Sequence, residues 1–199
     1  MEWIRHLFAP LSYLRIRHVR KVKYDFWIPL FAATFTWLAL TNLPVPALLL
    51  TTGGLLDRVS KLIEVLVGFF IAALAAVATF DRHDMDLPML GDPPTLRMRQ
   101  QGIVIIKKLS RRQFLCYLFG YLAFTSIFIY LSTLMLQLSA PSIESDLSLK
   151  ARMCFRSAGL FVYLFVFWNM IVTTLFGLYY LTERINRDNR ESHEKRDSV

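Results

Sequence analysis

The sequence predicts an all-α membrane protein with four transmembrane helices and with both the N-terminus and the C-terminus in the cytoplasm. Of its 199 residues, 55% are apolar and only 19% are charged, whereas about a quarter of the residues in a soluble globular domain are charged. The charges are also unevenly placed, because four long stretches contain none: 26–56, 65–80, 113–143 and 157–182. This composition disfavours a soluble enzyme, a disordered protein and a disulfide-linked scaffold.

The uncharged stretches set the predicted spans, because a helix needs about 20 apolar residues to cross the hydrocarbon core of a bilayer. We predict spans at 26–42, 62–80, 114–138 and 157–181. The second is short and carries Glu64 near its start, so a buried helix of a soluble protein is an alternative there. Its core, VLVGFFIAALAAVATF, is nevertheless more typical of a membrane helix.

The distribution of basic residues predicts the orientation. The N-terminal arm, the central loop and the tail together hold 18 Lys and Arg, and the two other connections hold 5. Because cytoplasmic loops are enriched in Lys and Arg, the termini and the central loop are predicted to be cytoplasmic. The connections at about 43–61 and 139–156 then face outward. The apolar sequence of the first, LPVPALLLTTGGLL, is compatible with an interfacial loop or a re-entrant segment.

The chain divides into three predicted parts. Residues 1–25 form a basic amphipathic N-terminal arm, expected as a helix in the lipid headgroup region that Pro10 bends or interrupts. Residues 26–181 form the four-helix transmembrane domain, which includes the cytoplasmic central loop at 81–112. Residues 182–199 form a charged cytoplasmic tail.

The second span carries small residues and one carboxylate at intervals of four, which places them on one helical face. They are Glu64, Gly68, Ala72 and Ala76. Small side chains allow two helices to approach closely in lipid, and an ionisable group within the membrane is often functional. Glu64 therefore either lines a pore or anchors the helix end beside Lys61.

The fourth span repeats this interval. Asn169, Thr173 and Gly177 share a face, and an Asn in the middle of a membrane helix needs a hydrogen-bond partner. We therefore predict that this face contacts another helix or lines a pore.

The central loop has an acidic half followed by a basic half. In the acidic half, Asp81, His83, Asp84 and Asp86 indicate a solvated turn, because no second group of ligands completes a metal site. The basic half, TLRMRQQGIVIIKKLSRR, fits nucleic acid, lipid headgroups or an acidic protein. We predict that a partner binds there, at Arg97, Arg99, Lys107, Lys108, Arg111 and Arg112. Without a recognised nucleic-acid fold, direct nucleic-acid binding is not expected.

The chain carries no sequence motif of a catalytic site. It has no Gly-rich phosphate loop, no G-x-S-x-G and no H-E-x-x-H. Its four histidines all fall in predicted cytoplasmic segments, which disfavours a Ser–His pair within the membrane. We therefore expect no enzymatic activity, no cofactor and no metal.

The layout of the whole chain resembles the membrane subunit of the Kiwa anti-phage defence system. The shared features are the length, four spans, a basic arm, a short charged tail and a middle loop, FDRHDMDLPMLGDPP followed by RRQFLCYLFGYLAF. The resemblance implies a homo-oligomeric, tetrameric sensor in the bacterial inner membrane that works with a cytosolic DNA-binding effector protein. The expected partners are thus membrane lipids, further copies of the chain and that effector. The residues alone leave a homo-oligomeric ion channel or toxic pore as the alternative, with an intramembrane lipid-modifying enzyme less favoured.

Overall fold

The fold is all-α apart from one small sheet. The computed structural model describes residues 8–17, 23–42, 54–79, 83–86, 94–100, 103–146 and 149–184. Within these residues lie five α-helices: α2 (Ile28–Asn42), α3 (Leu55–Thr79), α4 (His83–Asp86), α5 (Arg111–Asp146) and α6 (Leu149–Tyr179). Shorter helical turns are η1 (Ala9–Arg15), η2 (Lys23–Trp27) and η3 (Tyr180–Arg184).

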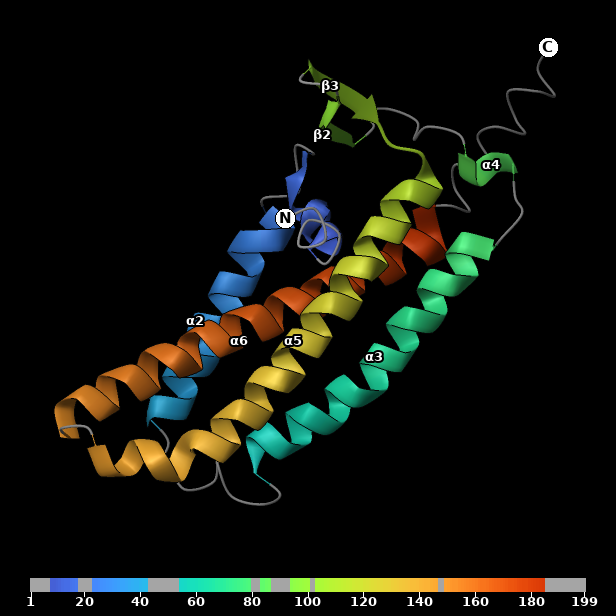
Figure 1. The fold of residues 1–199 in the computed structure, drawn as a ribbon. Coiled ribbons are helices and arrows are strands. Elements are labelled where there is room, and N and C mark those ends of the chain that lie inside the picture. The colour runs from blue at the N-terminus through green and yellow to red at the C-terminus, as the bar shows by residue number, and fades with distance from the viewer. Residues whose placement is uncertain are drawn as a thin grey trace, which may run out of the picture.

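The four longer helices run alternately up and down, and α6 crosses behind α5 (Figure 1). Helix α5 packs against both α3 and α6, and α2 packs against α6. The helices therefore contact one another in the order α3, α5, α6, α2. We call the end of the molecule at which α5 begins at Arg111 and α6 ends at Tyr179 the hairpin end, because a β-hairpin lies there.

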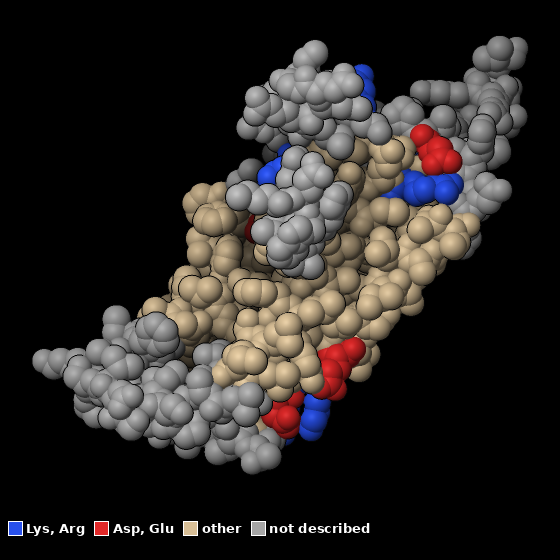
Figure 2. All heavy atoms as spheres, viewed as in Figure 1, with Lys and Arg blue, Asp and Glu red and all other residues tan. Residues whose placement is uncertain are grey.

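Three of these helices are long and apolar enough to cross a membrane. They are Leu55–Thr79, Arg111–Met135 and Ser157–Thr182, and they match the second, third and fourth predicted spans. Figure 2 shows the described Lys, Arg, Asp and Glu near the two ends of the molecule, with an uncharged surface between them. This is the pattern of a multi-pass membrane protein. At the first predicted span α2 has 15 residues, or about 22 Å of α-helix, which is shorter than the hydrocarbon core.

The apolar core lies around α5. Along α3 the buried residues recur every seven positions, at Leu56, Ile63, Phe70 and Val77, so they form a single seam facing α5. The opposite faces of α2 and α3 expose large apolar side chains, of which Phe31 is 78% exposed. An apolar outer surface of this kind suits lipid better than water.

The helices extend beyond the predicted spans. The predicted outward connection at 139–156 is mostly helical, because α5 continues to Asp146 and α6 begins at Leu149. Likewise α3 begins at Leu55, within the predicted connection at 43–61. The reason is that charged side chains end an apolar span without ending a helix, so the charge pattern locates the membrane but not the helix termini.

A three-stranded antiparallel sheet lies at the hairpin end and was not predicted. Its strands are β1 (Ile16–Arg17), β2 (Thr95–Gln100) and β3 (Ile103–Lys108), in the order β1-β2-β3. The sequence nevertheless carries the signal of a β-hairpin. TLRMRQ alternates in polarity, IVIIKK is rich in β-branched residues, and two residues that include a Gly separate the two segments. The pairing of Ile16 with Leu96 joins the N-terminal arm to the central loop.

Candidate functional site

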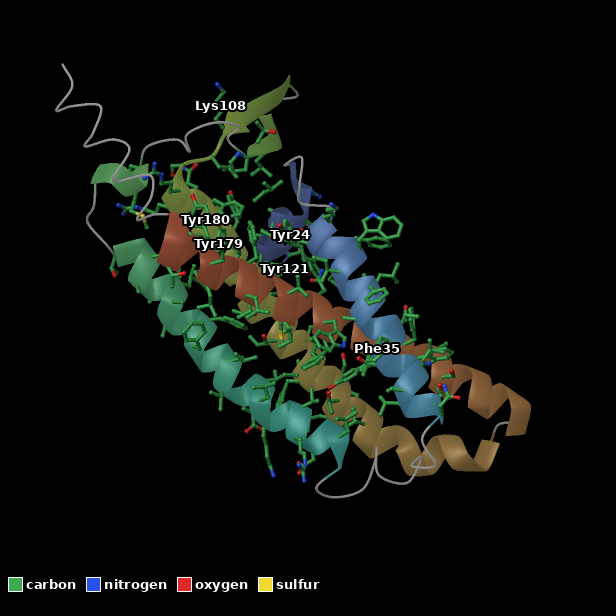
Figure 3. All side chains as sticks on the ribbon, turned by 180° about the vertical axis from the view of Figure 1, so that it is seen from behind. Tyr24, Phe35, Lys108, Tyr121, Tyr179 and Tyr180 are labelled. Carbon is green, nitrogen blue, oxygen red and sulfur yellow. The ribbon has the colours of Figure 1, made fainter. Side chains whose placement is uncertain are left out.

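Four segments converge on buried polar side chains at the hairpin end. Tyr13 comes from η1, Asp25 from η2, Tyr121 from α5 and Asn169 from α6. We call these four residues the inner polar cluster. Figure 3 shows Tyr121 among the helices, and both tyrosines and Asn169 are buried.

Hydrogen bonds connect the inner polar cluster. The Tyr121 hydroxyl donates to Asn169 Oδ1 at 2.7 Å, and Asn169 Nδ2 donates to the backbone carbonyl of Asp25 at 2.6 Å. The Tyr13 hydroxyl donates to Asp25 Oδ1 at 3.3 Å, and its ring stacks on Tyr121 with the ring centroids 5.0 Å apart. The cluster thus ties the arm and the start of α2 to α5 and α6.

Electrostatics keeps the Tyr13 hydroxyl neutral. Burial raises the pKa of Tyr13, and the nearby negative charge of Asp25 raises it further. A neutral hydroxyl remains a hydrogen-bond donor to the Asp25 carboxylate. The described part of the N-terminal arm is therefore held on the helices by buried packing and a hydrogen bond. Its place in the headgroup region stays a prediction, and residues 1–7 lie outside the described part of the chain.

The polar strip of the fourth span is packed inside the chain. Thr173 is buried beside Asn169 on α6. At Gly177, an added Cβ would lie 2.9 Å from Leu118 Cδ2 of α5, so the missing side chain allows the close approach of α6 to α5. The helix that Asn169 and Gly177 contact is therefore α5 of the same chain.

The strip on α3 faces away from the other helices. Glu64, Gly68, Ala72 and Ala76 are all exposed, and a Cβ at Gly68 would meet no atom within 4 Å. Lys61 forms its ion pair with Asp57, at 3.2 Å. The pairing of Glu64 with Lys61 that the sequence allowed is therefore not formed, and a contact with another chain or a pore stays a prediction.

Two of the predicted partner-binding residues are engaged within the chain. Arg111 is buried. Arg112 forms an ion pair with Asp86 of α4, in which Nε lies 3.0 Å from Oδ1 and Nη2 donates a hydrogen bond to Oδ2 at 3.2 Å. This pair fixes α4 against the start of α5, so neither arginine presents a free charge to a partner.

The acidic half of the central loop is only partly described. Asp86 has its acceptor oxygens on Arg112, and the side chains of residues 81–84 lie outside the described part. Among the described residues, no three His, Cys, Asp or Glu side chains come together in a way that suits a metal ion.

The other predicted partner-binding residues belong to the sheet, and the strand register determines which face of the sheet each one lies on. Opposite residues of an antiparallel pair lie on the same face, and neighbours along a strand lie on opposite faces. Thr95 pairs with both Arg17 and Lys108, and Arg97 and Arg99 follow at intervals of two. One face therefore carries Arg17, Arg97, Arg99 and Lys108, which we call the basic face.

The opposite face of the sheet carries Lys107. It shares that face with Leu96 and Ile16, both of which are buried. Lys108, by contrast, is exposed and projects away from the helices in Figure 3. The six cations predicted as one surface are therefore divided among the basic face, the inner face and the start of α5.

Sequence reasoning missed the inner polar cluster, apart from Asn169, and it missed Arg17 of the basic face. Tyr13, Asp25 and Tyr121 are isolated polar residues in different segments, and no spacing in the sequence relates them. Arg17 joins the basic face only through the pairing of β1 with β2. Comparison of the chain with protein-family models, curated proteins and solved structures found no match.

Proposed function

We propose that this chain is a non-enzymatic sensor or scaffold subunit of the bacterial inner membrane that recruits and regulates a cytosolic effector protein. The observation that carries the proposal is the small sheet that the N-terminal arm and the central loop build together at the hairpin end. A folded unit with a basic face, joined to membrane helices, is suited to hold a soluble partner at the membrane.

Strand pairing supports four membrane crossings. β1 precedes α2, and β2 follows α3. Two strands that pair must lie on the same side of a membrane, so the chain between them crosses it an even number of times. If α3 crosses as a candidate span, the pairing supports a crossing by α2 as well. With η2 it provides the 20 helical residues from Lys23 to Asn42, about 30 Å if the rise is that of an α-helix.

The inner polar cluster offers a route for regulation. Asn169 on α6 bonds to Tyr121 and to the start of α2, while Tyr13 lies three residues before β1. A shift of α6 against α5 would change the position of the arm, and with it the sheet. A stimulus in the membrane could thereby alter the binding of a cytosolic partner.

The assignment to phage defence rests on the resemblance to the Kiwa membrane subunit. In that role the effector is the DNA-binding component, and the present chain contributes an oligomeric, tetrameric anchor. The net charge of +8 then serves mainly topology and partner binding.

The test is affinity purification of the chain from its native host in mild detergent, followed by mass spectrometry. We expect one soluble protein in stoichiometric amount. As the matched control, another multi-pass membrane protein purified in the same way should not retain that protein. Purification of the chain alone, as an oligomer without a soluble companion, would contradict the proposal.

The exposed strip on α3 favours the second candidate function, a homo-oligomeric ion channel or toxic pore. Glu64 is exposed on a helix that can span a membrane, and copies of this face could meet around a polar path. If so, the chain conducts ions in liposomes and Glu64→Gln changes their selectivity. A bilayer that remains sealed would reject the channel.

A further inference from the structure

The outer edge of β3 adjoins the basic face of the sheet. The sheet order is β1-β2-β3, so β3 is an edge strand. Among the described residues no other strand pairs with its outer side. An edge strand presents unpaired backbone N–H and C=O groups, to which an extended peptide can add as a further strand.

One hydrogen bond fixes which backbone groups of β3 point outward. Leu109 N–H donates to the Pro94 carbonyl at 3.1 Å, and these two residues continue the β2–β3 register by one step. Opposite pairs alternate between hydrogen-bonded and non-hydrogen-bonded. The next pair, Thr95 with Lys108, is therefore non-hydrogen-bonded, and the groups of Lys108, Ile106 and Val104 are directed to the outer edge.

These outward positions belong to the basic face. Val104, Ile106 and Lys108 alternate along β3 on the side that also carries Arg97 and Arg99 of β2. A residue of an added strand directly opposite Ile106 would lie two strand spacings, or about 10 Å, from the backbone of Arg97. That separation is within the combined reach of an arginine and a glutamate side chain. The segment from Pro94 to Ser110 contains no Asp or Glu, so its charge is uncompensated within the hairpin.

We propose that the effector binds here through an extended acidic segment, which adds to the outer edge of β3 and places its carboxylates over the basic face. This inference rests on the proposed function and names the chemistry of its partner. The alternating backbone groups of the edge match a peptide and not a nucleic acid. A second copy of the chain would bring like charges together, and Lys108 projects away from the helices (Figure 3), which disfavours a lipid surface.

The probe is a capped synthetic peptide of alternating Glu and Val, measured by fluorescence anisotropy against the full-length chain in detergent. Two isomers of the peptide carry N-methyl groups either on every Glu or on every Val. Because alternate N–H groups of a strand point to the same side, strand addition requires one isomer to bind at least about tenfold more weakly than the other. Equal affinity of the two isomers would overturn strand addition.

Adjacent lysines supply the matched variants. Lys108→Gln, on the basic face, should weaken the binding of the unmethylated peptide several-fold, and Arg97→Gln combined with Arg99→Gln at least about tenfold. Lys107→Gln, the same change on the opposite face, should have an effect of less than about twofold. An equal effect of Lys107→Gln and Lys108→Gln would contradict the basic face. So would tighter binding of a single-stranded oligonucleotide, or of vesicles containing phosphatidylserine, than of the peptide.

The same variants separate this inference from the proposed function. In one outcome, a soluble protein co-purifies with the wild-type chain and remains bound to Lys108→Gln and to the double arginine variant. That result would support the proposed function and contradict the acidic docking segment. Peptide binding as described, without any soluble companion in the purification, would reject the recruited effector and keep the peptide-binding surface.

Discussion

Asn169 forms two hydrogen bonds to other segments within the inner polar cluster. Its amide accepts a hydrogen bond from Tyr121 and donates one to the carbonyl of Asp25. Removing it leaves a buried donor and a buried acceptor without these partners, which costs more than the net value of the bonds themselves.

We expect Asn169→Ala to lower the free energy of unfolding by about 1–2 kcal/mol, measured as a lower thermal midpoint in detergent. Thr79→Ala is the control, because the exposed Thr79 hydroxyl bonds to carbonyls of its own helix. Equal midpoints for the two variants would show that the cluster does not hold the helices together.

The raised pKa of Tyr13 predicts that the chain becomes less stable at alkaline pH. Its pKa in the fold is raised above the usual value of 10.0, so folding favours the neutral hydroxyl. The contribution of Tyr13 is therefore complete below about pH 10 and is lost as the pH rises above it.

We expect the thermal midpoint of the wild-type chain to fall more steeply than that of Tyr13→Phe as the pH rises through this range. The exposed Tyr24 provides the control, and Tyr24→Phe should follow the wild type. If the thermal midpoint of Tyr13→Phe falls with pH in parallel with that of the wild type, Tyr13 does not cause the loss of stability at alkaline pH.

At the scale of the elements, α6 and α3 each carry one glycine within a strip of residues spaced four apart, and the surroundings of the two glycines differ. Gly177 on α6 faces Leu118, with an added Cβ only 2.9 Å from its Cδ2. Leu118 is fully buried, which restricts its movement. Gly68 on α3 faces open space.

Gly177→Ala should therefore destabilise the chain by about 1 kcal/mol through overpacking. Gly68→Ala should be neutral or slightly stabilising, because alanine favours a helix over glycine. Thermal midpoints in detergent compare the two. A loss of stability in Gly68→Ala, together with a change of oligomeric state in size-exclusion chromatography, would assign the α3 strip to contact between chains.

Three of the four predicted spans match helices that could cross a membrane, and the sheet could also have been predicted. Uncharged stretches such as 65–80 mark three helices well, because lipid excludes charge. Helix ends such as Asp146 could not be located, since a helix can continue in water after its apolar span ends. The hairpin is not among the predicted elements because the alternation of TLRMRQ also fits a charged loop. Strand β1 cannot be predicted, because two residues are too short to show a period.

Less of the candidate site than of the fold could be predicted from the sequence. Asn169 and Gly177 share a helical face, and that spacing pointed to helix contact. Their partners, Tyr121 and Leu118, are set by how α5 packs on α6, which no local pattern specifies. Arg111 and Arg112 looked like part of a basic patch, but burial and the ion pair with Asp86 became visible only in three dimensions.

In the whole molecule, the pairing of strands and the distribution of basic residues both bear on how the chain is oriented in the membrane. The pairing of β1 with β2 requires the arm and the central loop to share one side of the membrane, and the distribution of Lys and Arg predicts that this side is the cytoplasm. With this orientation, we expect the basic face to meet soluble proteins of the cytosol and the connection between α5 and α6 to face outward.

Cysteine accessibility in intact cells tests this claim most directly. In a background with Cys116→Ser and Cys154→Ser, single variants Lys108→Cys and Ser148→Cys are treated with a membrane-impermeant maleimide that reaches the outer face of the inner membrane. We predict labelling of Ser148→Cys in intact cells, and of Lys108→Cys only after the membrane is disrupted. Labelling of Lys108→Cys from outside, or of both variants equally before disruption, would contradict a membrane scaffold that presents its sheet to the cytosol.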